Sequence, residues 1–105
     1  GQIGWNARCV FETDDLVAQI RQALQHIVAV LETAGGSPRD VTSLTWYLTD
    51  RGEYLARSKE VGEAYRAVMG RHFPAMTAVE VSSLMESRAK VEIQAIAVVA
   101  PAAAL

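Results

Sequence analysis

The clearest pattern of apolar and polar positions lies near the start of the chain. Apolar residues recur every three or four positions over residues 16–34, and Gly35 and Gly36 follow them. This spacing gives an α-helix one apolar stripe, and glycine readily takes the left-handed conformation in which helices end. The pattern predicts an amphipathic helix over residues 14–34, with N-cap candidates at Thr13–Asp15.

Strand-like segments surround a second helical one. Residues 41–49 alternate between two faces, as a β-strand does, and residues 1–5 also resemble a strand. Asp50, followed by Glu53, resembles a capping box and is expected to begin a helix over residues 51–70. Two further strand-like runs, 76–84 and 90–99, follow a proline. The order of these segments predicts an α+β fold in which two helices pack on one face of a mixed sheet.

The outer face of this sheet is unusually apolar. With two helices available, one sheet face stays uncovered, and such a face is normally polar. Here it is expected to carry both apolar and polar side chains, namely Tyr47, Met76, Ala78, Ile96, Val98, Glu80, Glu92 and Gln94. A half-apolar bare face indicates that another subunit covers it, whereas the alternative is ordinary surface variation.

Composition narrows the possible functions. The 105 residues suit one domain, which we place at residues 1–99, with a frayed tail over 100–105. Ten Lys and Arg residues against twelve Asp and Glu residues give a net charge of −2, which argues against nucleic acid as a partner. No apolar run approaches the roughly 20 residues that span a bilayer, so we expect no membrane contact. Together with the single cysteine, these features favour a cytoplasmic location.

Few side chains are arranged for chemistry. The histidines, His26 and His72, are far apart and belong to no ligand-spaced cluster, so we expect no metal and no cofactor. Cys9 has no neighbouring base and is interpreted as a small residue of a strand or hairpin. Glu80 and Glu92 stand inside apolar strands, where partial burial would raise a carboxyl pKa towards general acid–base use. The alternative for both is a structural hydrogen bond near an interface.

Five segments, in order, resemble the RidA/YjgF family over residues 1–99. They are Gly1-Gln2-Ile3, Gln19-Ile20-Arg21-Gln22-Ala23-Leu24, Ala34-Gly35, Phe73-Pro74-Ala75-Met76-Thr77-Ala78-Val79-Glu80-Val81 and Val91-Glu92-Ile93-Gln94-Ala95-Ile96-Ala97. The resemblance implies a chorismate-mutase-like fold and a homotrimer whose sheets form a central barrel, with clefts between subunits. The family usually has a further strand before the first segment, so we expect that the first strand is missing here.

The resemblance also implies a reaction. The family's best-known activity is the hydrolysis of reactive enamines and imines, formed from amino acids, to keto acids and ammonia. Glu92 matches the glutamate that positions the attacking water, and Gly1 matches a glycine of the binding site. Tyr65 matches the tyrosine of the family's Asn-x-x-Tyr segment, which adds it to the expected substrate-binding residues.

Three positions depart from the family pattern. Met76 replaces the arginine that binds the substrate carboxylate, Ala78 replaces a cysteine, and Gly62 replaces the asparagine. A hydrogen bond to a charged group contributes roughly 1.5–3 kcal/mol, and a thioether cannot replace it. We therefore expect weak activity on imines that carry a carboxylate.

Three hypotheses follow. In the first, the cleft acts on a more apolar small molecule, and Met76 and Ala78 line a hydrophobic pocket. In the second, Arg8 or Arg88 reaches the cleft and replaces the missing cation. In the third, the protein is a non-catalytic trimer that binds a small metabolite or regulates a partner. The first assigns a hydrolase of the deaminase type, and the third assigns a binding protein.

Overall fold

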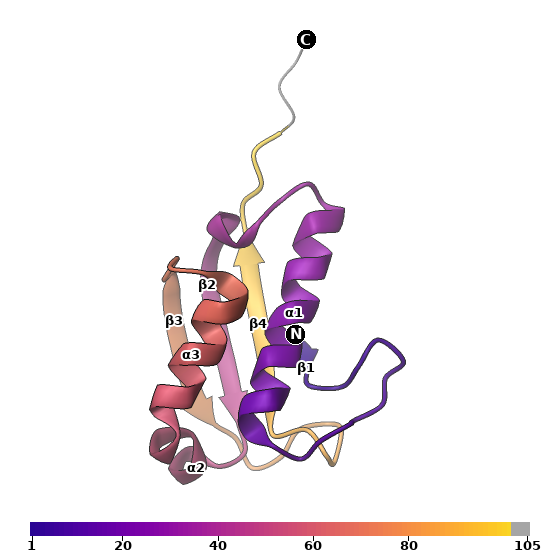
Figure 1. The fold of residues 1–105 in the computed structure, drawn as a ribbon, viewed down its shortest axis with the longest axis vertical. Helices are drawn as coiled ribbons and strands as arrows, with labels where there is room; N and C mark the ends of the chain where they lie inside the picture. Colours follow the sequence, from indigo (N-terminus) through magenta and orange to yellow (C-terminus); the bar gives the residue numbers. More distant parts are fainter. Residues whose placement is uncertain (102–105) are drawn as a thin grey trace.

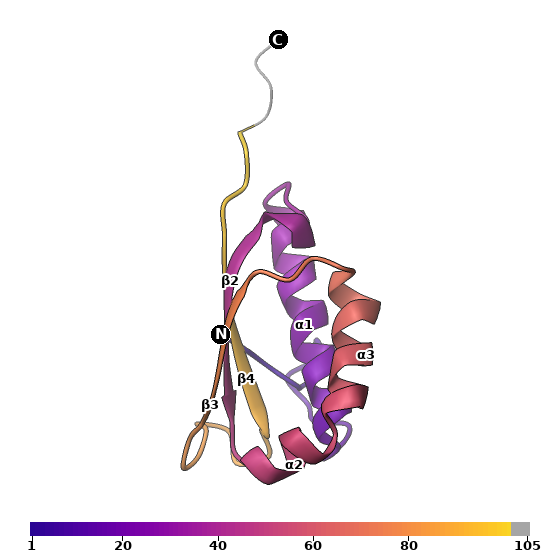
Figure 2. The ribbon, with the colours of Figure 1, turned by 90° about the vertical axis from the view of Figure 1, so that its left-hand side faces the viewer.

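The computed structural model describes residues 1–101 as one layer of helices on one layer of sheet. Residues 102–105, which belong to the expected frayed tail, lie outside the described residues. The helices all lie on the same side of the sheet (Figure 2), which confirms the predicted α+β architecture. In chain order the elements are β1 (Gln2–Ile3), α1 (Leu16–Thr33), the 3-10 helix η1 (Pro38–Asp40), β2 (Val41–Leu48), α2 (Arg51–Ala56), α3 (Ser58–Met69), β3 (Ala75–Glu80) and β4 (Val91–Ala97).

The sheet is mixed, with the strand order β1-β4-β2-β3. β2 and β3 run parallel, because α2 and α3 carry the chain back between them, whereas β4 pairs antiparallel with both β1 and β2 (Figure 1). β2 and β4 therefore form the centre of the sheet, and β3 is an edge strand whose six residues are all exposed.

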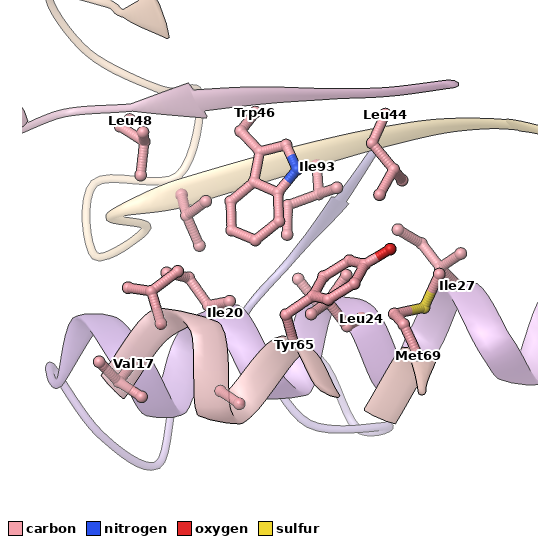
Figure 3. Packing of buried hydrophobic residues seen from close by; sticks show 14 of the residues in the cluster. Val17, Ile20, Leu24, Ile27, Leu44, Trp46, Leu48, Tyr65, Met69 and Ile93 are labelled. Carbon is pink, nitrogen blue, oxygen red and sulfur yellow. The ribbon is translucent and has the colours of Figure 1, made fainter. Parts of the chain in front are cut away.

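The first helix supplies most of the core. Ile20, Ala23 and Leu24 have no exposed surface. Ile20 and Leu24 face the buried side chains of β2 and β4 (Figure 3). Asp15 caps the helix by accepting a hydrogen bond from the Ala18 N–H at 2.9 Å. Gly35, with a φ of 79°, ends it. The helix lies within two residues of the predicted boundaries at its N-terminus and one at its C-terminus.

The second predicted helix is in fact two, which corrects the expectation of one helix over residues 51–70. α2 ends and α3 begins at Arg57, whose φ of −113° and ψ of 24° are not helical. Its guanidinium is ion-paired with Asp15 and with Glu60. α2 has no fully buried residue and reaches the core only through the partly buried Tyr54, so core packing holds it in line with α3 only weakly.

The strands are shorter than the alternation predicted. The first contains only Gln2 and Ile3, and the run expected over 76–84 ends at Glu80. The prediction of a strand over residues 81–84 is wrong. The Val81 N–H still donates to the carbonyl oxygen of Leu48, the last residue of β2, but no residue of β2 remains for 82–84 to pair with. The alternation of apolar and polar residues does not show whether a neighbouring strand is there to pair with. The ends of a strand are therefore set by pairing, which alternation alone does not predict.

The face of the sheet opposite the helices is uncovered. Glu92, which pairs with Tyr47, lies on this open face, and so do Gln94 and Ile96 further along β4, as predicted. The prediction was wrong for Met76, Ala78 and Glu80. They pair with Leu44, Trp46 and Leu48, which point into the core, so they lie on the helix side of the edge strand.

No helix within residues 1–101 combines the length and the apolar character that crossing a bilayer requires.

Candidate functional site

A hollow of about 270 Å³ surrounds the Glu92 side chain on the open face of the sheet. Glu92 is half-buried at the start of β4. Strand pairing places Tyr47 directly opposite it, and the Tyr47 hydroxyl lies 3.5 Å from Oε1 of Gln94. The hollow is lined by Gly1, Tyr47, Val81, Ser83, Leu84, Met85, Glu92 and Gln94. One carboxylate therefore faces a pocket with a mainly apolar and hydroxyl lining.

Gly1 closes one side of this hollow. β1 pairs with β4 so that Ile3 lies opposite Glu92, which brings the first residue beside the carboxylate. A Cβ atom at position 1 would collide with Oε2 of Glu92. With glycine here the Glu92 carboxylate lies against the backbone without having to move aside, and the contact brings together two of the five residues expected in the site.

Met76 and Ala78 do not join this hollow within one chain. Their side chains project from the helix side of β3, while Glu92 projects from the open side of β4. Met76 is 43% exposed, and Phe73, three residues earlier in the chain, is also exposed. These residues can meet Glu92 only where two copies of the chain contact each other.

Tyr65 is a core residue, with only 4% of its surface exposed. Its ring stacks on Phe73 and packs near Trp46, and its hydroxyl donates to the His72 carbonyl oxygen at 2.5 Å. Burial raises the pKa of the Tyr65 hydroxyl above its usual value. Tyr65 is not among the residues that line the Glu92 hollow.

The other candidates have structural partners. The Glu80 carboxylate accepts a hydrogen bond from the Arg51 N–H at 2.7 Å, at the start of α2. Arg88 pairs with Asp14 at 3.0 Å and donates to the Phe11 carbonyl oxygen. Arg8 is exposed, two residues from Asn6, whose side-chain oxygen its N–H contacts at 2.8 Å.

The histidines and the cysteine are similarly accounted for. Nε2 of His26 lies 2.5 Å from the Trp5 carbonyl oxygen, and Nε2 of His72 lies 2.8 Å from that of Val41. Cys9, which was expected in a strand or hairpin, is exposed in a turn with a φ of 61°. Within residues 1–101, no three His, Cys, Asp or Glu side chains converge as metal ligands would.

Sequence reasoning missed the contribution of the loop after β3. Ser83, Leu84 and Met85 line the Glu92 hollow, but the expected strand over 76–84 gave no reason to place them there. Tyr47 and Gln94 were placed on the correct face without being recognised as neighbours of Glu92. The alternation along each strand predicts which face a side chain is on. Which side chains of β2 and β4 are neighbours follows only when the register between the two strands is known.

Comparison with known proteins accounts for this arrangement. The family model described as "Endoribonuclease L-PSP" matches residues 1–99. The chain is 35% identical over 101 residues to the 2-iminobutanoate/2-iminopropanoate deaminase of Escherichia coli, covering 93% of this chain and 75% of that protein. The chain belongs to the RidA/YjgF family.

Other RidA/YjgF proteins agree with this assignment. A RutC family protein of Pyrococcus horikoshii is 41% identical over 83 residues, which are 79% of this chain but only 62% of that protein. The crystal structure of the Escherichia coli YjgF gene product superposes with a TM-score of 0.78 at 35% identity, covering 93% of this chain and 76% of that one. RidA from an Antarctic Psychrobacter superposes with a TM-score of 0.80 at 31% identity, covering 94% and 76% respectively.

Proposed function

We propose that this RidA/YjgF protein hydrolyses the C=N bond of small enamines or imines in clefts between its subunits. The half-buried Glu92, next to Gly1 on the open sheet face, carries the proposal. The name of the Escherichia coli relative, 2-iminobutanoate/2-iminopropanoate deaminase, supports the same reaction class.

The proposed cleft needs more than one copy of the chain. Glu92 and Gly1 lie on one side of the sheet, and Met76 and Ala78 lie on the other side at its edge. A homotrimer in which the open faces form a central barrel would bring the edge strand of one copy to the Glu92 hollow of the next. The apolar side chains exposed on that open face, Ile96 and Val98, support such an assembly.

Glu92 would act as the general base in this cleft. A carboxylate accepts a proton from water as the water oxygen bonds to the C=N carbon, and the nitrogen takes up a proton. Breakage of the C–N bond then releases ammonia and leaves a carbonyl compound. The overall reaction converts one imine and one water molecule into one carbonyl compound and one ammonia.

Met76 would set the substrate range. A substrate carboxylate is bound best by the planar fork of an arginine, which a thioether cannot imitate. With Met76 and Ala78 at the cleft, an uncharged and more apolar imine loses nothing on binding, whereas an imino acid buries an unpaired charge. Weak turnover of 2-iminopropanoate and faster turnover of an uncharged imine of similar size are therefore expected.

The test is ammonia release from imines generated in situ. An amino-acid oxidase supplies imino acids, and an amine oxidase supplies uncharged imines. Glu92→Gln should reduce the catalysed rate for uncharged imines at least about a hundredfold, within the range that general base catalysis contributes. Met76→Arg should raise kcat/KM for the imino acid by about ten- to a hundredfold, because it restores a charged hydrogen bond.

Glu32→Gln is the matched control, because Glu32 is an exposed carboxylate near the end of α1. It should leave both rates unchanged. Wild-type turnover of imino acids as fast as that of an arginine-bearing relative would contradict the role given to Met76. Equal rates for the wild type and Glu92→Gln would contradict catalysis at Glu92.

A non-catalytic trimer that binds a small metabolite is the second candidate. The replacement of the family's arginine, cysteine and asparagine by Met76, Ala78 and Gly62 favours it, because each removes a polar contact. This candidate predicts no catalysed hydrolysis of any imine, together with saturable binding of an uncharged ligand that Met76→Arg weakens.

A further inference from the structure

A second, larger hollow of about 800 Å³ lies at the other end of the molecule, where α3 ends and η1 begins. Its polar lining is dominated by cationic groups. The guanidinium-bearing residues Arg39, Arg66 and Arg71 come from η1, from the last turn of α3 and from the loop after it, and His72 completes the group. Three segments of the chain therefore bring basic side chains to one concave surface.

These charges are not neutralised by the protein. Arg39, Arg66 and Arg71 are exposed, and none forms an ion pair with another described residue. Within residues 1–101, no Asp or Glu lines the hollow. The neighbouring Asp40 turns its carboxylate to the Ser37 N–H, which donates to it at 2.8 Å. Like charges gathered without a counter-charge repel each other, and an anion relieves that repulsion.

The C-terminal end of α3 accounts for only part of this charge. A helix C-terminus carries roughly half a negative charge, which nearby cations stabilise. The Gly70 N–H already satisfies one of its terminal carbonyl groups by donating to the Arg66 carbonyl oxygen at 3.0 Å. The three arginines carry more positive charge than the helix end requires, and the Arg66 guanidinium, which lies one turn back over Gly62, would turn to reach a ligand in the hollow.

His72 is held rigidly at the edge of the hollow. Because a carbonyl oxygen only accepts, Nε2 of His72 donates to the Val41 carbonyl at 2.8 Å. The His72 carbonyl in turn accepts from the buried Tyr65 hydroxyl. The imidazole therefore keeps one orientation while the arginines beside it are free to turn towards a ligand. Arg66 lies back over Gly62, where the absence of a side chain leaves it room.

We propose that this hollow binds the phosphate groups of a small organic phosphate, such as a nucleoside diphosphate. The forked guanidinium group matches phosphate oxygens in pairs, and three of them suit a diphosphate. Pro38, Val68 and Met69 supply an apolar surface for the rest of the molecule. The volume lies within the range of small-molecule sites in proteins. This site is distinct from the Glu92 hollow and shares no lining residue with it.

Isothermal titration calorimetry of the full chain with ADP, inorganic pyrophosphate and adenosine tests the proposal. ADP and pyrophosphate should bind, adenosine should bind far more weakly, and added salt should weaken the binding of both anions. Arg66→Gln and Arg71→Gln should each raise the Kd for ADP about tenfold or more, because each removes a charged hydrogen bond.

Arg21→Gln is the matched control, because Arg21 is an exposed arginine on α1 without an ion-pair partner among the described residues. It should leave the Kd unchanged, and equal unfolding temperatures of all variants should show that each folds. Absence of binding at about 10 mM ADP overturns the proposal, since contacts this numerous should exceed that affinity. An equal loss in Arg21→Gln also overturns it. So does binding of a short single-stranded RNA without binding of ADP.

Discussion

Gln19 is a polar side chain without any exposed surface, and its three hydrogen bonds explain why. Its amide nitrogen donates to the carbonyl oxygens of Thr13 and Arg88, and its amide oxygen accepts from the Lys90 N–H at 2.8 Å. The side chain thus joins α1 to the segment that precedes it and to the loop that precedes β4. A buried amide strengthens the fold in this way because it and its backbone partners satisfy each other's hydrogen-bonding groups.

Gln19→Leu should destabilise the protein by about 2–4 kcal/mol, although leucine has a similar size. The substitution leaves a backbone N–H and two carbonyl groups without partners, and each buried unpaired group costs roughly 1–3 kcal/mol. Urea unfolding followed by circular dichroism measures the change. Gln25→Leu, on the exposed side of the same helix, should change stability by less than about 0.5 kcal/mol. Equal effects of the two would contradict the role of Gln19.

Asp15 combines a helix cap with an ion pair. The Ala18 N–H, and then the Arg57 guanidinium, lower the pKa of the Asp15 carboxyl below its ordinary value of 3.8. A lowered pKa means that the folded state favours the charged form. The stability from this group is therefore complete above about pH 4 and is lost as the pH falls through the lowered pKa.

Asp15→Ala should cost about 1 kcal/mol at pH 7, as loss of an N-cap does. Asp15→Asn keeps an oxygen that can accept from the helix but removes the charge, so it should cost less. The difference between the wild type and Asp15→Asn should shrink as the pH falls below about 4, because the wild-type carboxyl then takes up a proton. Thermal unfolding across pH 2–7 measures this, and a constant difference at all pH values would rule out a contribution from the charge.

At the scale of elements, the break at Arg57 separates two helices with different supports. α3 buries Val61, Ala64, Tyr65 and Met69 against the core, whereas α2 buries none of its residues. α3 also contains Gly62 in its interior, where glycine lowers helix stability. A Cβ atom there would meet only the end of the flexible Arg66 side chain, at 3.2 Å.

Gly62→Ala should stabilise the protein by about 0.5–1 kcal/mol, because alanine loses less backbone freedom on folding. Gly70→Ala is the contrasting control. Gly70 ends α3 with a φ of 71°, which alanine adopts only at a cost, so this variant should be destabilised. The thermal unfolding temperatures of the two variants should move in opposite directions. A shift of both in the same direction would contradict the conformational argument.

At the scale of the whole molecule, the open sheet face carries both Glu92 and exposed apolar side chains. Ile96 is 54% exposed on this face, on the same strand as Glu92, and Val98, just beyond that strand, is 68% exposed. A sheet face that leaves aliphatic side chains in water gains free energy when a second copy covers it. The proposed assembly and the proposed chemistry therefore depend on the same surface.

Ile96→Lys should convert the proposed trimer to smaller species, because it places a charge in a covered apolar face. Light scattering over a range of protein concentrations measures the mass, and imine hydrolysis should fall with it. Leu55→Lys, at a similarly exposed position on α2, is the matched control and should leave the mass unchanged. A wild-type protein that stays monomeric at every concentration would contradict both the assembly and the intersubunit cleft.

Much of the fold and part of the candidate site were predictable from sequence. The stripe on α1, the alternation of β2 and the position of Glu92 in an apolar strand depend on residues within a few positions of one another. Hydrophobic periodicity records such local relations directly. The order of segments was also sufficient to identify the family.

The separation of Met76 from Glu92 onto opposite faces was decided only by the tertiary structure, as was the break at Arg57. The same holds for the gathering of Arg39, Arg66 and Arg71 around one hollow. Each of these depends on strand register or on a contact between distant segments. A one-residue change of register moves every side chain of a strand to the other face, while the sequence stays the same. Local patterns therefore determined which elements form, and long-range pairing determined what those elements bring together.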